Sequence, residues 1–292
     1  MYYIVYGLLY LFSLLPFRVL YLISDGIYGL VYYVFKYRRD VVKSNLALAL
    51  PERSESERKA IEKKFYHNFV DTFIETIKLL SASEKQIEKR FRANWSVINQ
   101  YYETGRSVHL HLGHNFNWDF ANVSLAKNTP FRLLAVYMPI SNKVMERLFF
   151  KLRSRFRSVM LPATQMRKAF IPYRNTQYLL ALVADQNPGD PAKAWWFNFL
   201  GRPAPFVKGP AKNAIIADAV IIHATIHKLK RGYYEAKMFV EEENPAGSTE
   251  QEITRKFVRF MEENIREYPE TWLWSHRRWR REWKEGYEEI VP

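Results

Sequence analysis

The sequence predicts an α/β protein in which a mainly parallel mixed sheet is flanked by helices. From residue 106 onward, segments with strand spacing alternate with segments with helical spacing, the order typical of parallel sheets. Apolar residues make up 48% of the 292 residues, which is enough for a sizeable core. No internal repeat or low-complexity linker divides the chain. One α/β domain, preceded by an apolar helical membrane anchor at the N-terminus, fits this pattern.

The first strand is predicted where apolar side chains recur at every second position. Val108, Leu110 and Leu112 are each separated by one histidine, which is the two-residue period of a strand. Gly113 ends this run, and the following "NWDFANVSLA" returns to helical spacing. Later strands are expected at residues 131–138, 178–186, 219–229 and 233–242. Later helices are expected at residues 142–156, 209–219 and 248–268, the last of them opened by Ser248.

A long amphipathic helix is predicted between residues 52 and 80. Ser54 and Glu57 have the spacing of a capping box, which marks the start of a helix. Apolar side chains then recur every four residues and form one stripe, which we expect to pack into the core. The stripe consists of Ile61, Phe65, Phe69, Phe73 and Ile77.

Residues 1–35 form an apolar and aromatic N-terminal segment. No charged side chain occurs before Arg18, and Pro16 interrupts the first apolar run, which leaves it short of the roughly 20 residues of a clean membrane span. We therefore expect a helical hairpin in the membrane plane or shallowly inserted, with a buried soluble helix pair as the alternative. The basic "KYRRDVVK" that follows suits anionic lipid. The chain then divides into a membrane-associated segment, 1–50, and an α/β domain, 51–292.

The charge and the cysteine content limit the classes of function. Cysteine is absent, which excludes disulfides, thiol nucleophiles and cysteine-based metal sites. The formal net charge of +14 predicts attraction to anionic lipid, to an acidic protein or to nucleic acid. Nucleic acid is the least expected partner because no reader motif is present. A basic surface with no dedicated partner is the alternative.

The stretch "VHLHLGHNFNWDF" holds three histidines that could bind a metal or transfer a proton. His109, His111 and His114 match H-x-H-x-x-H, close to the pattern of metallo-β-lactamase-like hydrolases. In that pattern an aspartate precedes the third histidine, whereas Gly113 stands here. A metal-dependent hydrolase using these three histidines stays an alternative with weak support. The histidines further downstream are His223, His227 and His276.

The second interpretation is proton transfer by His114. Asp119 follows it by five residues, so a carboxylate in the first turns of the next helix could bond one ring nitrogen and fix the tautomer. The other nitrogen could then take a proton from a substrate hydroxyl. Gly113 would let the backbone turn sharply and leave room for substrate. His109 and His111 lie on the other face of the strand from the leucines, and we expect them to be structural or to be polar groups that support the site residues from behind.

Several ordered blocks resemble one known family nearly from end to end. The sequence resembles the late lipid A acyltransferases of the lauroyl/myristoyl type, within the H-x-x-x-x-D/E lysophospholipid acyltransferase superfamily. The blocks are "YRRDVVKSNLALALP", "HLGHNFNWDF", "YMPISNKVMERLFFKLRSRF", "LLALVADQNPG" and "YPETWLWSHRRWR". Several blocks in the same order are far more specific than any one of them.

The resemblance implies a glycerolipid acyltransferase-like fold and an O-acyltransferase chemistry. An acyl chain would move from an acyl-carrier-protein thioester, or from acyl-CoA, to a hydroxyl of a lipid A precursor. By this match His114 is the general base and Asp119 orients it. No cofactor, metal or covalent acyl-enzyme is required, which agrees with the absence of cysteine and of a G-x-S-x-G elbow.

The resemblance also assigns a set of polar side chains to substrate binding. The set is Asn117, Arg153, Arg155, Asp185, Gln186, Arg277 and Arg278. Arg153 and Arg155 would bind phosphate or steady the thioester oxyanion, with a solvated basic helix face as the alternative. Asp185 and Gln186 follow a strand, where they would shape the pocket or make a turn. The last two arginines lie beside tryptophans and would form a phosphate-binding, interfacial patch.

One position departs from the family pattern and leaves the acceptor open. The lipid A branch usually has glutamate where this chain has Asp119, and aspartate is the form found in glycerolipid acyltransferases. A lysophospholipid or an amino-acid lipid is therefore an alternative acceptor. The expected location is the cytoplasmic face of a bacterial inner membrane, with peripheral or single-pass attachment. The expected partners are acyl carrier protein, an anionic lipid and the membrane surface.

Overall fold

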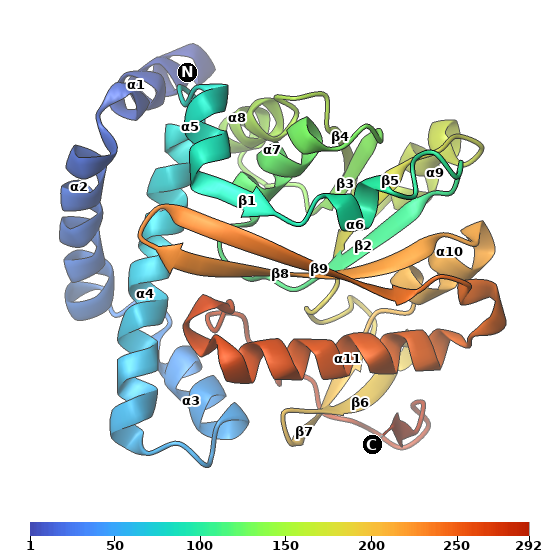
Figure 1. The fold of residues 1–292 in the computed structure, drawn as a ribbon. Helices are drawn as coiled ribbons and strands as arrows, with labels where there is room; N and C mark the ends of the chain where they lie inside the picture. Colours follow the sequence, from blue (N-terminus) through green and yellow to red (C-terminus); the bar gives the residue numbers. More distant parts are fainter. Residues whose placement is uncertain (292) are drawn as a thin grey trace.

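The computed structural model describes residues 1–291 and confirms the predicted α/β class (Figure 1). Its centre is a seven-stranded sheet with the order β1-β9-β8-β2-β5-β3-β4. β8, β2, β5, β3 and β4 run parallel, whereas β9 pairs antiparallel with β8 and β1 pairs parallel with β9. The strands are β1 Phe91–Ala93, β2 Val108–Leu112, β3 Leu133–Tyr137, β4 Val159–Pro162, β5 Leu179–Val183, β8 Val220–Lys230 and β9 Tyr233–Glu242.

The predicted helices cover the two faces of this sheet (Figure 1). On one side lie α7 (Trp118–Asn128) and α8 (Lys143–Arg153), and on the other lie α10 (Gly209–Ala217) and α11 (Glu250–Glu267). α11 opens with a capping box one residue after the predicted position. The remaining helices and helical turns are α1 Tyr2–Leu14, α2 Phe17–Gly29, η1 Leu30–Val34, α3 Arg39–Ala49, α4 Glu55–Lys78, α5 Glu84–Arg90, α6 Ser96–Asn99, η2 Ala163–Gln165, α9 Met166–Phe170, η3 Ile171–Tyr173, η4 Pro191–Lys193, η5 Pro245–Gly247 and η6 Pro269–Thr271.

A second, three-stranded sheet was not predicted from the sequence. It has the order β10-β6-β7. Its strands are β6 Trp195–Phe199, β7 Arg202–Phe206 and β10 Ile290–Val291. β7 contains Pro203 and Pro205, and proline within a run argues against a strand. These prolines are accommodated because β7 is an edge strand, where one row of backbone N–H groups needs no partner.

α4 begins as predicted but buries different side chains from those expected. Ser54 and Glu57 form the capping box: the Ser54 backbone N–H donates to Glu57 Oε2 at 2.7 Å. Of the predicted apolar stripe, Phe65 is fully buried whereas Phe73 is 45% exposed. The helix also buries four acidic or basic side chains, which hydrophobic periodicity assigns to solvent. They are Glu62, Asp71, Glu75 and Lys78.

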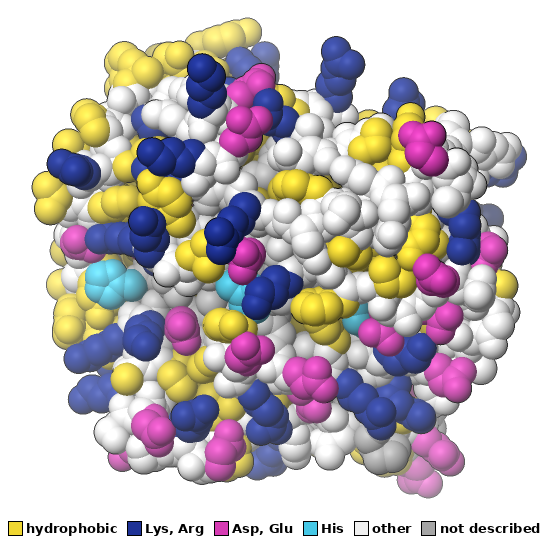
Figure 2. Space-filling model, viewed as in Figure 1, with side chains coloured by type: hydrophobic (Ala, Val, Ile, Leu, Met, Phe, Trp, Pro, Cys, Tyr) yellow, Lys and Arg dark blue, Asp and Glu magenta, His cyan; other side chains and the backbone are white. Residues whose placement is uncertain are grey.

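The N-terminal segment forms two helices that pack against α4. Among the described residues 1–291, no single helix is long and apolar enough to cross a membrane, but α1 together with residues 17–34 passes the same test as a pair bent by 114°. α2 buries Leu20 against α4, while α1 exposes large apolar side chains such as Ile4 and Leu8. Figure 2 shows hydrophobic side chains gathered at the upper left, where Figure 1 places α1, with Lys and Arg side chains nearby. The division at residue 50 stays a prediction.

Buried histidines line the face of the sheet that packs against α11. His111 of β2 pairs with His223 of β8 across parallel strands, and their ring centroids lie 6.1 Å apart. His109, His111 and His223 are each at most 2% exposed. Burial, which disfavours the charged imidazole, lowers the pKa of His109 to about 3 and that of His111 to about 4.

These histidines predict a loss of stability in mild acid. Below the ordinary histidine pKa of about 6.5, these histidines bind protons in the unfolded chain but stay neutral in the folded protein. The free energy of unfolding should therefore fall as the pH drops from about 6.5 to about 4, by about 1.4 kcal/mol per pH unit for each such histidine. Denaturant unfolding of His111→Leu across this range should show a shallower pH slope than the wild type. A slope equal to that of the wild type would contradict the conclusion that His111 is buried as a neutral imidazole.

Candidate active site

The candidate site lies where the carboxyl ends of two neighbouring parallel strands meet. β2 and β5 pair in register, with Leu112 opposite Val183. The backbone continues for two residues beyond the end of each strand, which brings His114 beside Asp185. The Ala184 backbone N–H donates to Leu112 O at 3.1 Å, so the pairing extends to the edge of the site. Ligands of open α/β sheets bind at this end of the strands.

Asp185 holds the ring of His114. The distance between His114 Nδ1 and Asp185 Oδ1 is 2.5 Å. The second carboxylate oxygen accepts the backbone N–H of His114 at 3.0 Å and the indole N–H of Trp272 at 2.6 Å. Within residues 1–291, His114 Nε2 makes no hydrogen bond, and the side chain is 24% exposed. A carboxylate bonded at Nδ1 leaves Nε2 as the nitrogen that can take a proton.

The Asp185 carboxylate is ionised by its surroundings. Burial alone would raise its pKa, but the nearby His114 charge, the hydrogen bonds from His114 and the Trp272 indole lower the pKa to about 2. Asp185 is only 1% exposed, so water does not compete for its oxygens. A buried carboxylate of this kind can stabilise the imidazolium that forms when His114 takes a proton.

The predicted bond between Asp119 and His114 is not what the structure contains. Asp119 lies in the first turn of α7, and its Oδ1 accepts from Arg153 Nε at 2.6 Å. Its Oδ2 accepts from Arg153 Nη2 and from Thr76 Oγ1, each at 3.4 Å. The partner of the histidine is therefore corrected to Asp185, because the Asp119 carboxylate is directed to α8 and α4. The catalytic roles of His114 and Asp119 themselves stay predictions.

A cavity of about 640 Å³ adjoins both residues. His114, Asp119 and Arg153 line it, together with mostly apolar side chains from α7 and from all seven strands of the large sheet. Leu110 and Leu112, which alternate with the buried histidines, belong to this lining. An apolar cavity with a few convergent polar groups is the usual form of a small-molecule or lipid site.

Arg153 and Gln186 line the cavity, whereas Asn117 does not. The substrate-binding roles of Arg153 and Gln186 stay predictions. Asn117 is fully buried and caps α7, since its Oδ1 accepts the Phe120 backbone N–H at 3.2 Å. Its amide is therefore held by protein groups and is not exposed to a ligand. Arg155 is also directed elsewhere: its guanidinium donates to the Leu79 carbonyl at 2.6 Å and does not line the cavity.

The two C-terminal arginines separate. Arg277 is exposed, as a phosphate-binding residue would be. Arg278 is fully buried, and it donates to Asn187 Oδ1 and to the Pro205 carbonyl, both at 2.9 Å. The prediction of a surface phosphate ligand is thus wrong for Arg278, because its guanidinium is enclosed by aromatic rings. It instead fixes Asn187, which lines the cavity.

The metal alternative is not supported by the geometry. His114 lines the cavity on the α7 side, whereas His111 packs against Phe257 of α11 with ring centroids 6.0 Å apart. The H-x-H-x-x-H residues therefore lie on opposite faces of the sheet. In residues 1–291, no group of three histidine, aspartate or glutamate side chains is placed to hold a metal ion.

The sequence contained one indication that Asp185 lies beside His114, but the spacing of the two residues along the chain did not reveal it. His114 and Asp185 are 71 residues apart, but each follows a predicted strand of the parallel sheet. Once the two strands are paired in register, the residues beyond their ends become neighbours. Trp272 carried no such signal, because it reaches the site from the irregular C-terminal segment.

We expect Asp185→Asn to lower kcat by about 10²–10⁴-fold while the protein stays folded. The amide has the size of the carboxylate but cannot stabilise an imidazolium, and it can reverse the tautomer of His114. Steady-state kinetics and a thermal melt check this. Asp190→Asn, in the exposed loop after β5, is the matched control and should retain wild-type kcat. Equal activities of the two variants would refute the role of Asp185.

Comparison with known families gave one result that covers the whole site. The family model described as bacterial lipid A biosynthesis acyltransferase matches residues 1–281. The matched range includes the N-terminal helices, the cavity and the C-terminal segment that carries Trp272. Comparison with curated proteins gave no match.

Proposed function

Because the chain belongs to the bacterial lipid A biosynthesis acyltransferase family, we propose that it moves an acyl chain from an acyl-carrier-protein thioester to a hydroxyl of a lipid A precursor. Membership already makes it an enzyme of acyl transfer to a glycolipid. The observation that carries the finer proposal is that His114, held by Asp185, lines a largely apolar cavity. An acyl chain gains about 0.8 kcal/mol for each CH₂ buried there.

The chemistry we propose needs one base and no covalent acyl-enzyme. Asp185 keeps the Nδ1–H of His114 in place, and Nε2 removes the proton of the acceptor hydroxyl as its oxygen attacks the thioester carbonyl. The tetrahedral intermediate then expels the thiolate, which takes the proton back from His114. Arg153, held by Asp119 at the cavity wall, supplies positive charge for the oxyanion.

The basic charge near the cavity supports an acidic donor protein. Residues 131–176 contain ten Lys and Arg side chains and one acid, Glu146. This segment also supplies Met138, Ile140 and Met166 to the cavity lining. A carrier protein with negative surface charge would be steered to the place where its acyl chain must enter. Acyl-CoA is the alternative donor.

The surface of α1 and α8 supports attachment to a membrane. Arg147 lies 4.1 Å from the ring centroid of Tyr2, and Lys151 lies 4.3 Å from that of Tyr6. Exposed apolar side chains of α1 and exposed cations of α8 therefore share one surface. This combination suits an anionic leaflet, and we propose peripheral or shallow attachment to the cytoplasmic face of the inner membrane.

We expect the wild-type enzyme to transfer acyl chains from acyl carrier protein to a lipid A precursor, and His114→Ala to lose at least about 10³-fold of this activity. Mass spectrometry of the acceptor identifies the product. Parallel reactions with acyl-CoA, and with a lysophospholipid or an amino-acid lipid, test the alternatives that Asp119 leaves open. Undiminished transfer by His114→Ala would exclude it as the base.

The double substitution Arg147→Glu/Lys151→Glu should weaken binding to anionic vesicles. Each basic side chain near an anionic surface contributes about 1 kcal/mol, so reversing two should cost on the order of 10²-fold in affinity. Vesicle sedimentation measures this, and the difference should shrink at high salt. Lys193→Glu, an exposed cation before β6, is the control. Equal binding by both variants would show that α8 is not part of the membrane-binding surface.

A further inference from the structure

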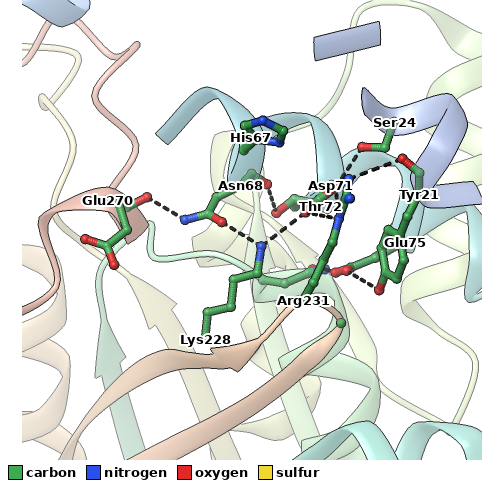
Figure 3. A network of polar contacts seen from close by, with 12 residues as sticks. Tyr21, Ser24, His67, Asn68, Asp71, Thr72, Glu75, Lys228, Arg231 and Glu270 are labelled. Carbon is green, nitrogen blue, oxygen red and sulfur yellow. Dashed lines mark hydrogen bonds and ion pairs between the residues drawn. The ribbon is translucent and has the colours of Figure 1, made fainter. Parts of the chain in front are cut away.

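A buried polar network joins α4 to α2 and to the turn between β8 and β9 (Figure 3). Its first centre is Asp71, which accepts from Arg231 Nη2 at 2.7 Å, from Lys228 Nζ at 3.1 Å and from Ser24 Oγ at 2.7 Å. Two cations face this carboxylate, so Asp71 forms buried ion pairs that hold α4 to the β8–β9 hairpin. Figure 3 also places Glu75 in this network, one turn further along α4.

Glu75 differs from Asp71 because all of its bonded partners are neutral. The carboxylate is fully buried and accepts from Tyr21 Oη at 2.8 Å, Tyr234 Oη at 2.6 Å and Asn117 Nδ2 at 2.9 Å. Within residues 1–291 it forms no ion pair. A buried carboxylate without a cation is costly, and burial raises its pKa. Its three donors come from α2, from β9 and from the residue that precedes α7.

The bond to Asn117 connects Glu75 to the candidate site. Asn117 lies between His114 and Asp119, and its Oδ1 caps α7 through the Phe120 backbone N–H. The amide thus faces α7 with its oxygen and Glu75 with its nitrogen. The next residue of α4 reaches the same helix, since Thr76 Oγ1 donates to Asp119 Oδ2 at 3.4 Å.

We propose that Glu75 is a positioning residue for acyl transfer, which fixes Asn117 and so presents His114 and Asp119 to the cavity in their reactive orientation. Through Tyr21, the same carboxylate joins this loop to α2. The inference rests on the proposed function for the roles of His114 and Asp119. Glu75 touches neither the cavity nor the reacting atoms, so its effect passes through Asn117.

Glu75→Gln tests the proposal with almost no change in size. The introduced amide can present its nitrogen to Asn117 Nδ2, which places two donors face to face. We expect kcat to fall about tenfold to a hundredfold, since small misplacements of reacting groups cost that much, with KM for the acyl donor unchanged. A purely structural role would lower the melting temperature without this selective loss of kcat.

A second substitution should restore activity by reversing the polarity of the bond. In the double variant Glu75→Gln/Asn117→Asp, the introduced amide donates to the introduced carboxylate, whose other oxygen can still cap α7. Asn117→Asp alone sets two carboxylates against each other and should be impaired. kcat of the double variant should therefore exceed that of either single variant. Asp71→Asn, in the same network but without a bond to the loop, should lower the melting temperature and leave kcat within about twofold.

Hydrogen exchange separates failure of this inference from failure of the proposed function. Amide exchange of the peptide covering residues 113–121, followed by mass spectrometry, needs no substrate. It should be faster in Glu75→Gln than in the wild type and should return to the wild-type rate in the double variant. An inactive wild type would refute the proposed function but would leave this readout intact. Unchanged exchange, or a double variant no better than the single ones, would overturn the role of Glu75.

Discussion

The hydrogen bond between His114 Nδ1 and Asp185 Oδ1 joins the ends of two parallel strands and determines which nitrogen of the His114 ring is available to the substrate. Strand register brings the two residues together, and burial of Asp185 excludes water from the bond. Because the carboxylate occupies one ring nitrogen, the other is left for substrate. Trp272 completes the arrangement by holding the second oxygen of Asp185. The proposed proton transfer depends on this pair before any other contact.

The elements around this pair serve distinct purposes. The apolar face of the sheet and α7 enclose the cavity, while α1 and α8 present apolar and basic side chains together. α4 lies between these regions and contains the buried carboxylates of Asp71 and Glu75. Asp71 is paired with cations and holds α4 to the β8–β9 hairpin. Glu75 accepts hydrogen bonds from neutral donors, one of which is Asn117, the residue that caps α7. The same helix can thus stabilise the fold and orient the site.

Local pattern predicted much of the fold and less of the site. Alternation located β2, and the capping box located the start of α4, because both signals arise from neighbouring residues. The partner of His114 was mispredicted as Asp119, since closeness in sequence does not say where a carboxylate in the first turn of a helix points. Asp185 required the register of β2 and β5, which is a long-range property. The burial of Glu75 contradicts helical periodicity and follows only from packing against α2 and β9.

The most direct test of the central claim is the ¹⁵N spectrum of the His114 ring in the folded, full-length protein. If Asp185 holds Nδ1, the neutral ring should carry its proton on Nδ1 and leave Nε2 unprotonated, and Asp185→Asn should disturb this preference. A neutral ring with its proton on Nε2 in the wild type would contradict the account, because Nε2 would then already carry a proton and could not take one from the acceptor.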